Sequence, residues 1–151
     1  MKDIDSFRDQ YFFLSNFYLC KITYNGLDYG SAEAAFQAQK TTNLKDQIPF
    51  TQMTPGQAKK YGKKVELRKD WEEVKVGIMR DIVKAKFDQN PILKEKLIDT
   101  GDVQLIEGNK WHDYFWGVCN GKGKNTLGII LMDLRKAYKE EWSCHSLKYT
   151  S

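Results

Sequence analysis

The chain contains few of the residues from which metal centres and disulfide frameworks are built. Its 151 residues include three cysteines and two histidines. Cys20, Cys119 and Cys144 are far apart and odd in number, which argues against a disulfide framework. His112 and His145 show no metal-ligand spacing. We therefore expect reduced thiols and a chemistry that uses no metal and no cofactor.

The sequence also lacks long hydrophobic runs and internal repeats. Its longest apolar run, residues 127–132, is far shorter than the roughly 20 residues that a membrane span requires. Residues 1–5 do not follow the charged-then-apolar order of a signal peptide. No repeat with a period of roughly 20 to 50 residues is present, which excludes solenoids and propellers. We expect a cytoplasmic protein, a monomer or weak homodimer, without a membrane partner.

Charge and apolar content favour a globular protein with an anionic ligand. Hydrophobic residues make up 41% of the chain, enough for a buried core, and the formal net charge is +4. This modest excess suits an anionic small molecule, whereas binding to nucleic acid normally requires a basic stripe. Lysines cluster at 59–64 and at 122–124, although the first cluster is also typical of a solvated helix face.

The first third of the chain predicts a hairpin followed by helices. Asn25-Gly26 is a strong turn signal, because both residues tolerate positive φ, and it predicts strands at 19–24 and 27–29. Ser31 is a suitable N-cap for a helix over 32–42. Thr54-Pro55 predicts the start of a second helix, since proline at the first helical position loses no hydrogen bond.

The remainder predicts three further helices. Asp70 and Glu73 resemble a capping box that opens a long helix with buried Trp71, Val74, Ile78, Ile82 and Ala85, flanked by Met79, Val83 and Phe87. A shorter helix is expected at 91–99 and a short strand at 102–106. The last helix begins at 125 or 126 and buries Leu127, Ile130, Leu131, Leu134 and Tyr138. Its periodicity fades from Glu140, which predicts a frayed polar tail to 151. The predicted class is α+β, mostly helical, with a small N-terminal antiparallel sheet.

The segment 31–40 combines small and polar residues in a helical pattern. Glu33, Gln37 and Lys40 fall on one side, and Ala32, Ala35, Phe36 and Gln39 on another. This pattern fits a pocket wall, and it also fits a surface helix with a Glu–Gln–Lys ladder. Glu33 lies in the first turn, where the helix dipole favours its ionised form. Such a carboxylate suits the cleavage of an N-glycosidic bond, in which positive charge develops at the anomeric carbon.

Two later segments offer base-stacking and phosphate-binding groups. Residues 111–117 are rich in aromatics that can stack a heterocyclic base or pack into the core, and Asp113 could bind ribose, orient the base or pair with a second carboxylate. Lys122, Lys124 and Asn125 precede a helix in a glycine-containing segment. This predicts either a phosphate site, without P-loop spacing, or a surface turn with Asn125 as N-cap.

Asn16 is a further candidate, since it lies between apolar residues in segment 13–17. Its side chain could bond to a base edge or stabilise a turn. Together, the segments 14–18, 31–40, 70–75, 113–117 and 121–128 resemble, in order, the YbiA-like family, also called the NADAR superfamily. The similarity extends from about residue 12 to 138. It implies a compact, mostly helical YbiA-like N-glycosidase domain over 1–142, followed by a polar C-terminal tail over 143–151.

The resemblance also implies an activity. Members of this family hydrolyse early riboflavin-pathway intermediates such as 5-amino-6-ribosylaminouracil 5′-phosphate, and release ribose 5-phosphate. Other members remove ADP-ribose from guanine in nucleic acid. The family's catalytic glutamate corresponds to Glu33 and the lysine of the same motif to Lys40. Positions that line the family's pocket correspond to Trp71, Asp113, Trp116 and Asn125. The chain departs from its relatives at Ala34-Ala35, where bulky residues are frequent, and at 118–120.

These features give a specific hypothesis with a phosphorylated ribosyl small molecule as partner. Glu33 stabilises the oxocarbenium-like transition state and positions water. Asp113 holds the ribose or aids protonation, and Lys40 pairs with Glu33 or attacks a ring-opened ribose. The substrate-binding set is Asn16, Phe36, Trp71, Trp116, Lys122, Lys124 and Asn125. ADP-ribosylated nucleic acid is the alternative substrate, and a non-catalytic ADP-ribose or NAD sensor is the rival function.

Overall fold

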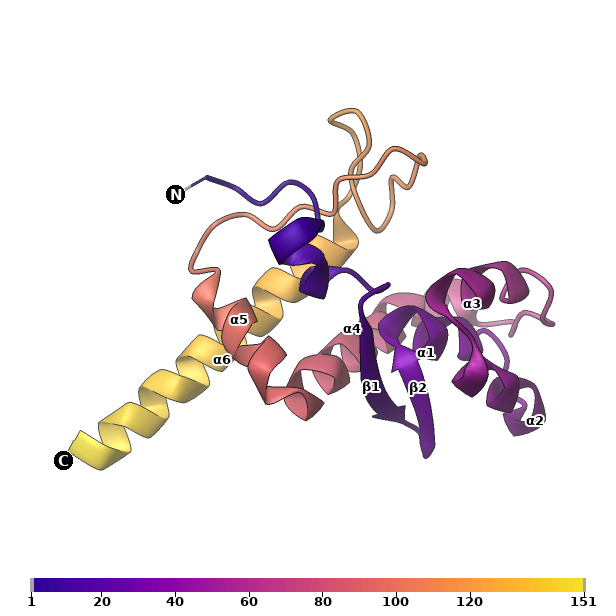
Figure 1. Ribbon diagram of the computed structural model, residues 1–151, viewed down its shortest axis with the longest axis horizontal. Coiled ribbons are helices and arrows are strands. Elements are labelled where there is room, and N and C mark those ends of the chain that lie inside the picture. The colour runs from indigo at the N-terminus through magenta and orange to yellow at the C-terminus, as the bar shows by residue number, and fades with distance from the viewer. Residues whose placement is uncertain (1, 151) are drawn as a thin grey trace. The chain divides into compact units, whose positions relative to one another are not determined.

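The computed structural model describes the backbone of residues 2–150 and the side chains as far as residue 144. The chain forms two compact units: one comprises the chain up to Leu14 and from Ile92 onward, and the other comprises Ser15–Pro91. Figure 1 shows the mostly helical fold with one two-stranded antiparallel hairpin, which is the predicted class. None of the described helices is both long enough and apolar enough to span a membrane.

The hairpin of the Ser15–Pro91 unit forms as predicted. Strands β1 (Leu19–Tyr24) and β2 (Leu27–Ser31) pair antiparallel, with Tyr24 opposite Leu27. Asn25 and Gly26 have φ values of 48° and 83°, the left-handed conformations that a tight two-residue hairpin turn requires. Strand β2 continues two residues beyond the predicted end, so it delivers the chain directly to the first buried helix.

Helix α1 (Ala32–Ala38) is the centre of this unit. The Ser31 hydroxyl accepts a hydrogen bond from the Ala34 amide at 3.1 Å, which confirms the predicted N-cap. All seven residues are buried, because α1 packs against β2, η2 (Ile48–Gln52), α3 (Pro55–Tyr61) and α4 (Trp71–Gln89). The helix ends at Ala38, earlier than the predicted 42. The short helix α2 (Leu44–Gln47) follows it.

The sequence predicted two helix N-termini, one at Thr54 and one at Asp70, and the structure agrees fully with only the first. Thr54 and Gln57 form a complete capping box at the start of α3. Asp70 precedes α4 as predicted, but its side chain makes no capping bond. Its carboxylate instead accepts hydrogen bonds from the Arg68 guanidinium, at 2.6 Å from Nε and 3.1 Å from Nη2. The predicted Asp70–Glu73 capping box is therefore wrong, because a stronger charged partner lies two residues away.

The buried face of α4 is rotated relative to the prediction. Val74, Ile78 and Ala85 are only partly buried, whereas the buried residues are Trp71, Met79, Ile82, Val83, Lys86 and Phe87. The helix packs along β1 and α1 with this face. The rotation places a lysine in the interior, which apolar periodicity alone does not indicate.

The other unit contains η1 (Asp9–Leu14), α5 (Pro91–Asp99) and α6 (Thr126–Thr150). Both α5 and α6 begin where the sequence predicts, and α6 buries Leu127, Ile130, Leu131, Arg135 and Tyr138. Leu134 is only partly buried. The predicted strand at 102–106 is wrong, since Leu105 makes only an isolated parallel bridge with Ile4. The backbone is helical to Thr150, so residues 143–150 continue α6, and fraying of this tail stays a prediction.

Candidate active site

Glu33 lies buried at the start of α1, with 8% of its surface exposed. Its backbone N–H donates to the Asn16 carbonyl at 3.0 Å. One turn later, Gln37 donates from Nε2 to Oε1 of the Glu33 carboxylate at 2.8 Å. The surface-helix interpretation of this segment is therefore wrong. Both the main chain and the carboxylate of Glu33 are held by named partners.

Gln37 was not among the predicted site residues, although it lies in the motif that contains Glu33. It is 6% exposed, and its Oε1 is buried without a hydrogen-bond partner. The amide therefore donates to the Glu33 carboxylate while its own oxygen stays unpaired. Gly62 gives this amide its space, because a Cβ at position 62 would collide with Oε1 of Gln37. The spacing of Glu33 and Gln37 indicated one helix face, but nothing in the sequence indicated Gly62.

Lys40 lies two residues beyond the end of α1, near the aromatic rings of Phe36 on α1 and Trp71 on α4. The Lys40 Nζ is 6.0 Å from the centroid of the Trp71 ring, and the rings of Phe36 and Trp71 are 5.0 Å apart at 50°. Burial lowers the pKa of Lys40, with a smaller contribution from Lys63, while the Glu33 carboxylate opposes the shift. A lowered pKa leaves more of this amine uncharged and nucleophilic.

Arg68 fixes the chain that carries Lys40 and is another residue that the sequence did not single out. Its backbone N–H donates to the Lys40 carbonyl at 2.8 Å, and its Nη1 donates to the Gln39 carbonyl at 3.5 Å. The same guanidinium binds Asp70, the residue before Trp71. Arg68 thus joins the segment after α1 to the beginning of α4, where Trp71 is 8% exposed.

Asn16 lies next to Glu33 and has a definite role within the fold. Its carbonyl receives the Glu33 N–H, and its Nδ2 donates to the Met79 sulfur at 3.4 Å. These contacts join Asn16 to α1 and α4 and do not lie within a turn, so the turn-stabilising interpretation also stays a prediction. A sulfur is a weak acceptor, so contact with a base edge stays a prediction for this amide.

Asp113 organises residues 111–117 of the other unit, the aromatic loop. Its Oδ1 accepts hydrogen bonds from the backbone amides of Phe115 at 3.1 Å and Trp116 at 2.9 Å. The Asn109 side chain binds the Asp113 backbone twice: its Nδ2 donates to the Asp113 carbonyl, and its Oδ1 accepts from the Asp113 N–H. These contacts give Asp113 a structural task in addition to any catalytic one. The loop is not fully packed into the core, because Trp111 is 53% exposed.

Trp116 lies in this loop as a partly buried ring. It meets Phe115 edge to face, with centroids 4.8 Å apart at 89°. The edge-to-face contact fixes the plane of the indole, which is a precondition for stacking a heterocyclic base on it. Stacking of substrate on Trp116 stays a prediction.

The glycine–lysine segment, residues 121–125, uses several of its backbone amides within its own loop. Its amides already donate to loop carbonyls: Lys122 to Cys119, Lys124 to Tyr114, Asn125 to Gly117, Thr126 to Phe115 and Leu127 to Trp116, at 2.8–3.2 Å. The N-terminal amides of α6 thus stabilise the loop. The side chains of Lys122 and Lys124 are exposed, and the Lys124 Nζ is 5.6 Å from the Phe115 ring centroid. Phosphate binding by these two ammonium groups stays a prediction.

Asn125 also serves the loop. Its Oδ1 accepts from the Glu107 amide and its Nδ2 donates to the Leu105 carbonyl, both at 2.9 Å. With both ends of the amide engaged, the side chain is not an N-cap of α6. Its main chain has a φ of 52°, and its carbonyl accepts the first helical bond from Ile129. Contact of this side chain with substrate stays a prediction, because one N–H of Nδ2 and one lone pair of Oδ1 are not used in these two bonds.

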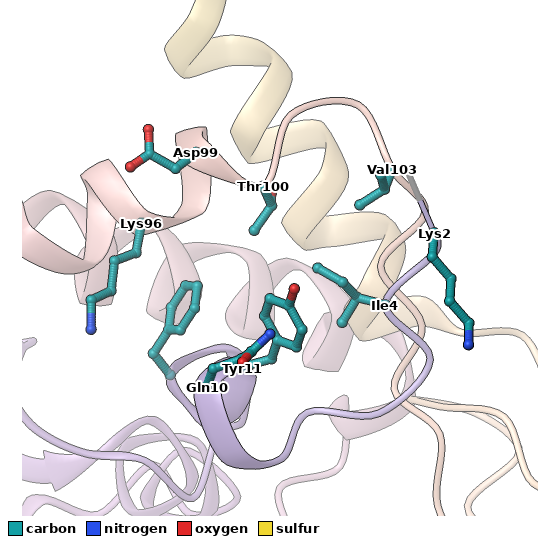
Figure 2. A pocket seen from close by; sticks show the side chains of 9 residues that line it. Lys2, Ile4, Gln10, Tyr11, Lys96, Asp99, Thr100 and Val103 are labelled. Carbon is teal, nitrogen blue, oxygen red and sulfur yellow. The ribbon is translucent and has the colours of Figure 1, made fainter.

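The predicted site residues divide between the two units. The Ser15–Pro91 unit brings together Asn16, Glu33, Phe36, Lys40 and Trp71, and the other unit carries Asp113, Trp116, Lys122, Lys124 and Asn125. A cavity of about 610 Å³ in this second unit contains none of them and is lined by residues such as Lys2, Ile4, Tyr11, Phe13, Lys96 and Thr100 (Figure 2). Asp99 is its one lining carboxylate, so the cavity offers no carboxylate pair. Within the described part of the chain, no three His, Cys, Asp or Glu side chains gather at a metal site.

Comparison with known proteins identifies relatives of this chain. The family model described as NADAR domain matches residues 4–139. N-glycosidase YbiA of Shigella boydii is 38% identical over 132 residues, which cover 85% of this chain and 82% of YbiA. A riboflavin biosynthesis protein of Vibrio vulnificus is 39% identical over 132 residues, but the match covers only 36% of that longer protein. The NMR structure of E. coli YbiA superposes with a TM-score of 0.82 at 36% identity, covering 93% of this chain and 88% of that one.

Proposed function

Because the chain belongs to the NADAR domain family, we propose that it is an N-glycosidase that hydrolyses the ribose C1–N bond of a phosphorylated, nucleotide-like substrate. The observation that carries this proposal is the buried Glu33 carboxylate, which Gln37 orients through a 2.8 Å hydrogen bond. The N-glycosidase name of YbiA, which is 38% identical over most of both chains, supports the same reaction.

Glu33 supplies the electrostatic part of the mechanism. Departure of the nitrogen leaves positive charge at ribose C1 and the ring oxygen. A fixed carboxylate beside C1 stabilises that charge more strongly in a buried site than in water, and it accepts a proton from the attacking water. The hydrogen bond from Gln37 prevents the Glu33 carboxylate from turning away. The bond from the Glu33 backbone N–H to the Asn16 carbonyl fixes the start of α1.

Lys40, Trp71 and Phe36 supply the neighbouring contacts. The Phe36–Trp71 pair offers an aromatic surface for the leaving base. Lys40 either balances the Glu33 charge or, as a neutral amine, adds to the C1 imine of a ring-opened ribose. The base then leaves as its free amine, and water hydrolyses the resulting Lys40 imine to release the sugar and restore the lysine. The lowered pKa of Lys40 favours the second role.

The favoured substrate is 5-amino-6-ribosylaminouracil 5′-phosphate, with ribose 5-phosphate as product. The riboflavin biosynthesis name of the Vibrio vulnificus relative supports this choice. Removal of ADP-ribose from guanine in nucleic acid is the second candidate. It is favoured by the exposed lysines at 59, 60, 63 and 64, which lie at and just beyond the end of α3 in the same unit as Glu33.

A parallel hydrolysis assay tests the proposal. Purified wild type, Glu33→Ala and the exposed-residue control Glu66→Gln are offered the riboflavin intermediate and ADP-ribosylated guanine DNA. We expect wild type and Glu66→Gln to release ribose 5-phosphate or ADP-ribose, and Glu33→Ala to be slower by roughly 100-fold or more. Ligand binding without release by folded wild type would instead support a non-catalytic ADP-ribose or NAD sensor.

A further inference from the structure

Lys86 is a charged residue in the interior of the Ser15–Pro91 unit. It lies on α4 with 1% of its surface exposed, and its Nζ donates to the Ser15 carbonyl at 2.9 Å. The rings of Tyr18 and Phe87 lie 5.8 Å and 5.2 Å from the ammonium. Lys86 takes part in none of the ion pairs formed by the described residues. A carbonyl and two aromatic faces therefore compensate its charge in place of a carboxylate, although burial of an ammonium without an opposite charge is costly.

The contacts of Lys86 lead directly to Glu33. Helix α4 fastens the segment 15–16 at two points seven residues apart, which is two turns on one helix face. Lys86 donates to the Ser15 carbonyl, and Met79 receives the Asn16 amide. The next carbonyl along the chain, that of Asn16, accepts the backbone N–H of Glu33 at 3.0 Å. Two successive peptide carbonyls thus connect the ammonium to the residue that carries the carboxylate.

We propose that Lys86 is a positioning residue: its ammonium fixes the segment Ser15–Asn16, and this segment holds the start of α1 so that the Glu33 carboxylate stays aimed at the reacting carbon. Lys86 touches no substrate in this role. The inference rests on the proposed function of Glu33, but the hydrogen-bonded connection between Lys86 and the Glu33 amide can be tested without any substrate.

The ammonium form is the one that positions Glu33. Burial lowers the pKa of Lys86 to about 8, and the only other titratable group that contributes is the Cys20 thiol on β1, which raises it. Tyr18, before β1, presents its ring face. Above this pH the neutral amine is a weaker donor to the Ser15 carbonyl than the ammonium is. The segment then loosens, and kcat falls while KM changes little.

The test compares Lys86→Met with Lys84→Met, which removes an exposed lysine from the same helix. Methionine keeps the length of the buried side chain but donates no hydrogen bond. In Lys86→Met we expect hydrogen exchange at the Glu33 amide to accelerate by roughly 10-fold or more. We also expect kcat at neutral pH to fall by about 10-fold with KM within about 2-fold, and the alkaline limb near pH 8 to disappear. Lys84→Met should match wild type in each measurement.

Folded Lys86→Met with the Glu33 exchange rate, kcat and pH profile of wild type would overturn the inference. If wild type releases no product from any substrate, the proposed function fails, while the exchange rate still decides the role of Lys86. If Lys86→Met does not fold, NMR titration of wild type replaces it. The Lys86 Nζ and the Glu33 amide should then titrate together with a midpoint near 8, and a Glu33 amide without that inflection would refute the connection.

Discussion

Gly62 shows how a residue without a side chain can affect the position of a proposed catalytic carboxylate. The space above it holds the Gln37 amide that orients Glu33. The residue was not predicted, because its partner lies 25 positions earlier in the sequence, and such a contact exists only after α1 and α3 have packed. By contrast, the Glu33–Gln37 pair lies one helical turn apart, a spacing that the sequence displays directly.

Replacing Gly62 with alanine should therefore misplace Gln37. The added Cβ would strike Oε1 of Gln37, so we expect kcat to fall by roughly 10-fold and unfolding to become easier by about 1–3 kcal/mol. Gly56→Ala is the matched control, because an added Cβ on that residue of α3 meets no atom within 4 Å. Steady-state kinetics and urea denaturation of both variants measure the effect. Equal kcat in the two variants would show that Gln37 does not need its present position.

Lys63 provides a charge test at the same scale. Its ammonium is one cause of the lowered pKa of Lys40, although burial contributes more. Lys63→Ser should therefore raise the pKa of Lys40 and reduce the fraction of neutral amine at a given pH. If neutral Lys40 is the reacting form, activity should then require a higher pH. NMR titration of the Lys40 side chain in Lys63→Ser and in the control Lys60→Ser measures this shift. A Lys40 titration midpoint that is the same in Lys63→Ser as in wild type would contradict the account.

Lys86 makes a prediction for stability as well as activity. Its pKa falls from 10.5 in the unfolded chain to about 8 in the folded protein. Between these pH values the unfolded chain retains a proton that the folded protein has released, so folding is favoured increasingly as pH rises. Relative to Lys86→Met, wild type should gain about 3 kcal/mol of unfolding free energy between pH 8 and 10.5. Denaturation of both proteins at the two pH values measures this gain, and parallel stabilities would contradict it.

At the scale of elements, the sequence correctly predicted those local structures that depend only on neighbouring residues. The Asn25-Gly26 turn, the Ser31 cap and the Thr54 capping box all form. The errors involve partners that are distant or compete locally. Arg68 takes the Asp70 carboxylate from the predicted capping box. Carbonyls of the aromatic loop accept hydrogen bonds from the N-terminal amides of α6, where the anion site stays a prediction.

Substitution of Asn125 tests whether its side chain stabilises the aromatic loop. Its side chain joins the Glu107 amide to the Leu105 carbonyl, and its φ of 52° is a conformation that alanine resists. Asn125→Ala should lose about 2–4 kcal/mol of stability through two unpaired backbone groups and added strain. Asn125→Gly should lose less, because glycine adopts this φ freely. Thermal unfolding decides between this role and the predicted substrate contact, which would raise KM and leave stability unchanged.

At the scale of the whole molecule, the fold is the part that the sequence predicted most completely. The NADAR model spans residues 4–139, and the YbiA structure matches 93% of the chain. The ordered motifs were sufficient for this because they include residues of both compact units. The division of labour within the motifs was not predictable. The side chains of Asp113 and Asn125 resemble ligand-binding groups in sequence, yet they make hydrogen bonds that shape their own loop.

The central claim is that the Glu33 carboxylate drives N-glycosidic cleavage. The most direct measurement is the rate of ribose 5-phosphate release from 5-amino-6-ribosylaminouracil 5′-phosphate by wild type and by Glu33→Gln. Glutamine preserves the size of the side chain and can still accept the hydrogen bond from Gln37, so the fold should persist. The account predicts a loss of roughly 100-fold or more in kcat, because the negative charge is gone. A folded Glu33→Gln protein with the wild-type rate would contradict it.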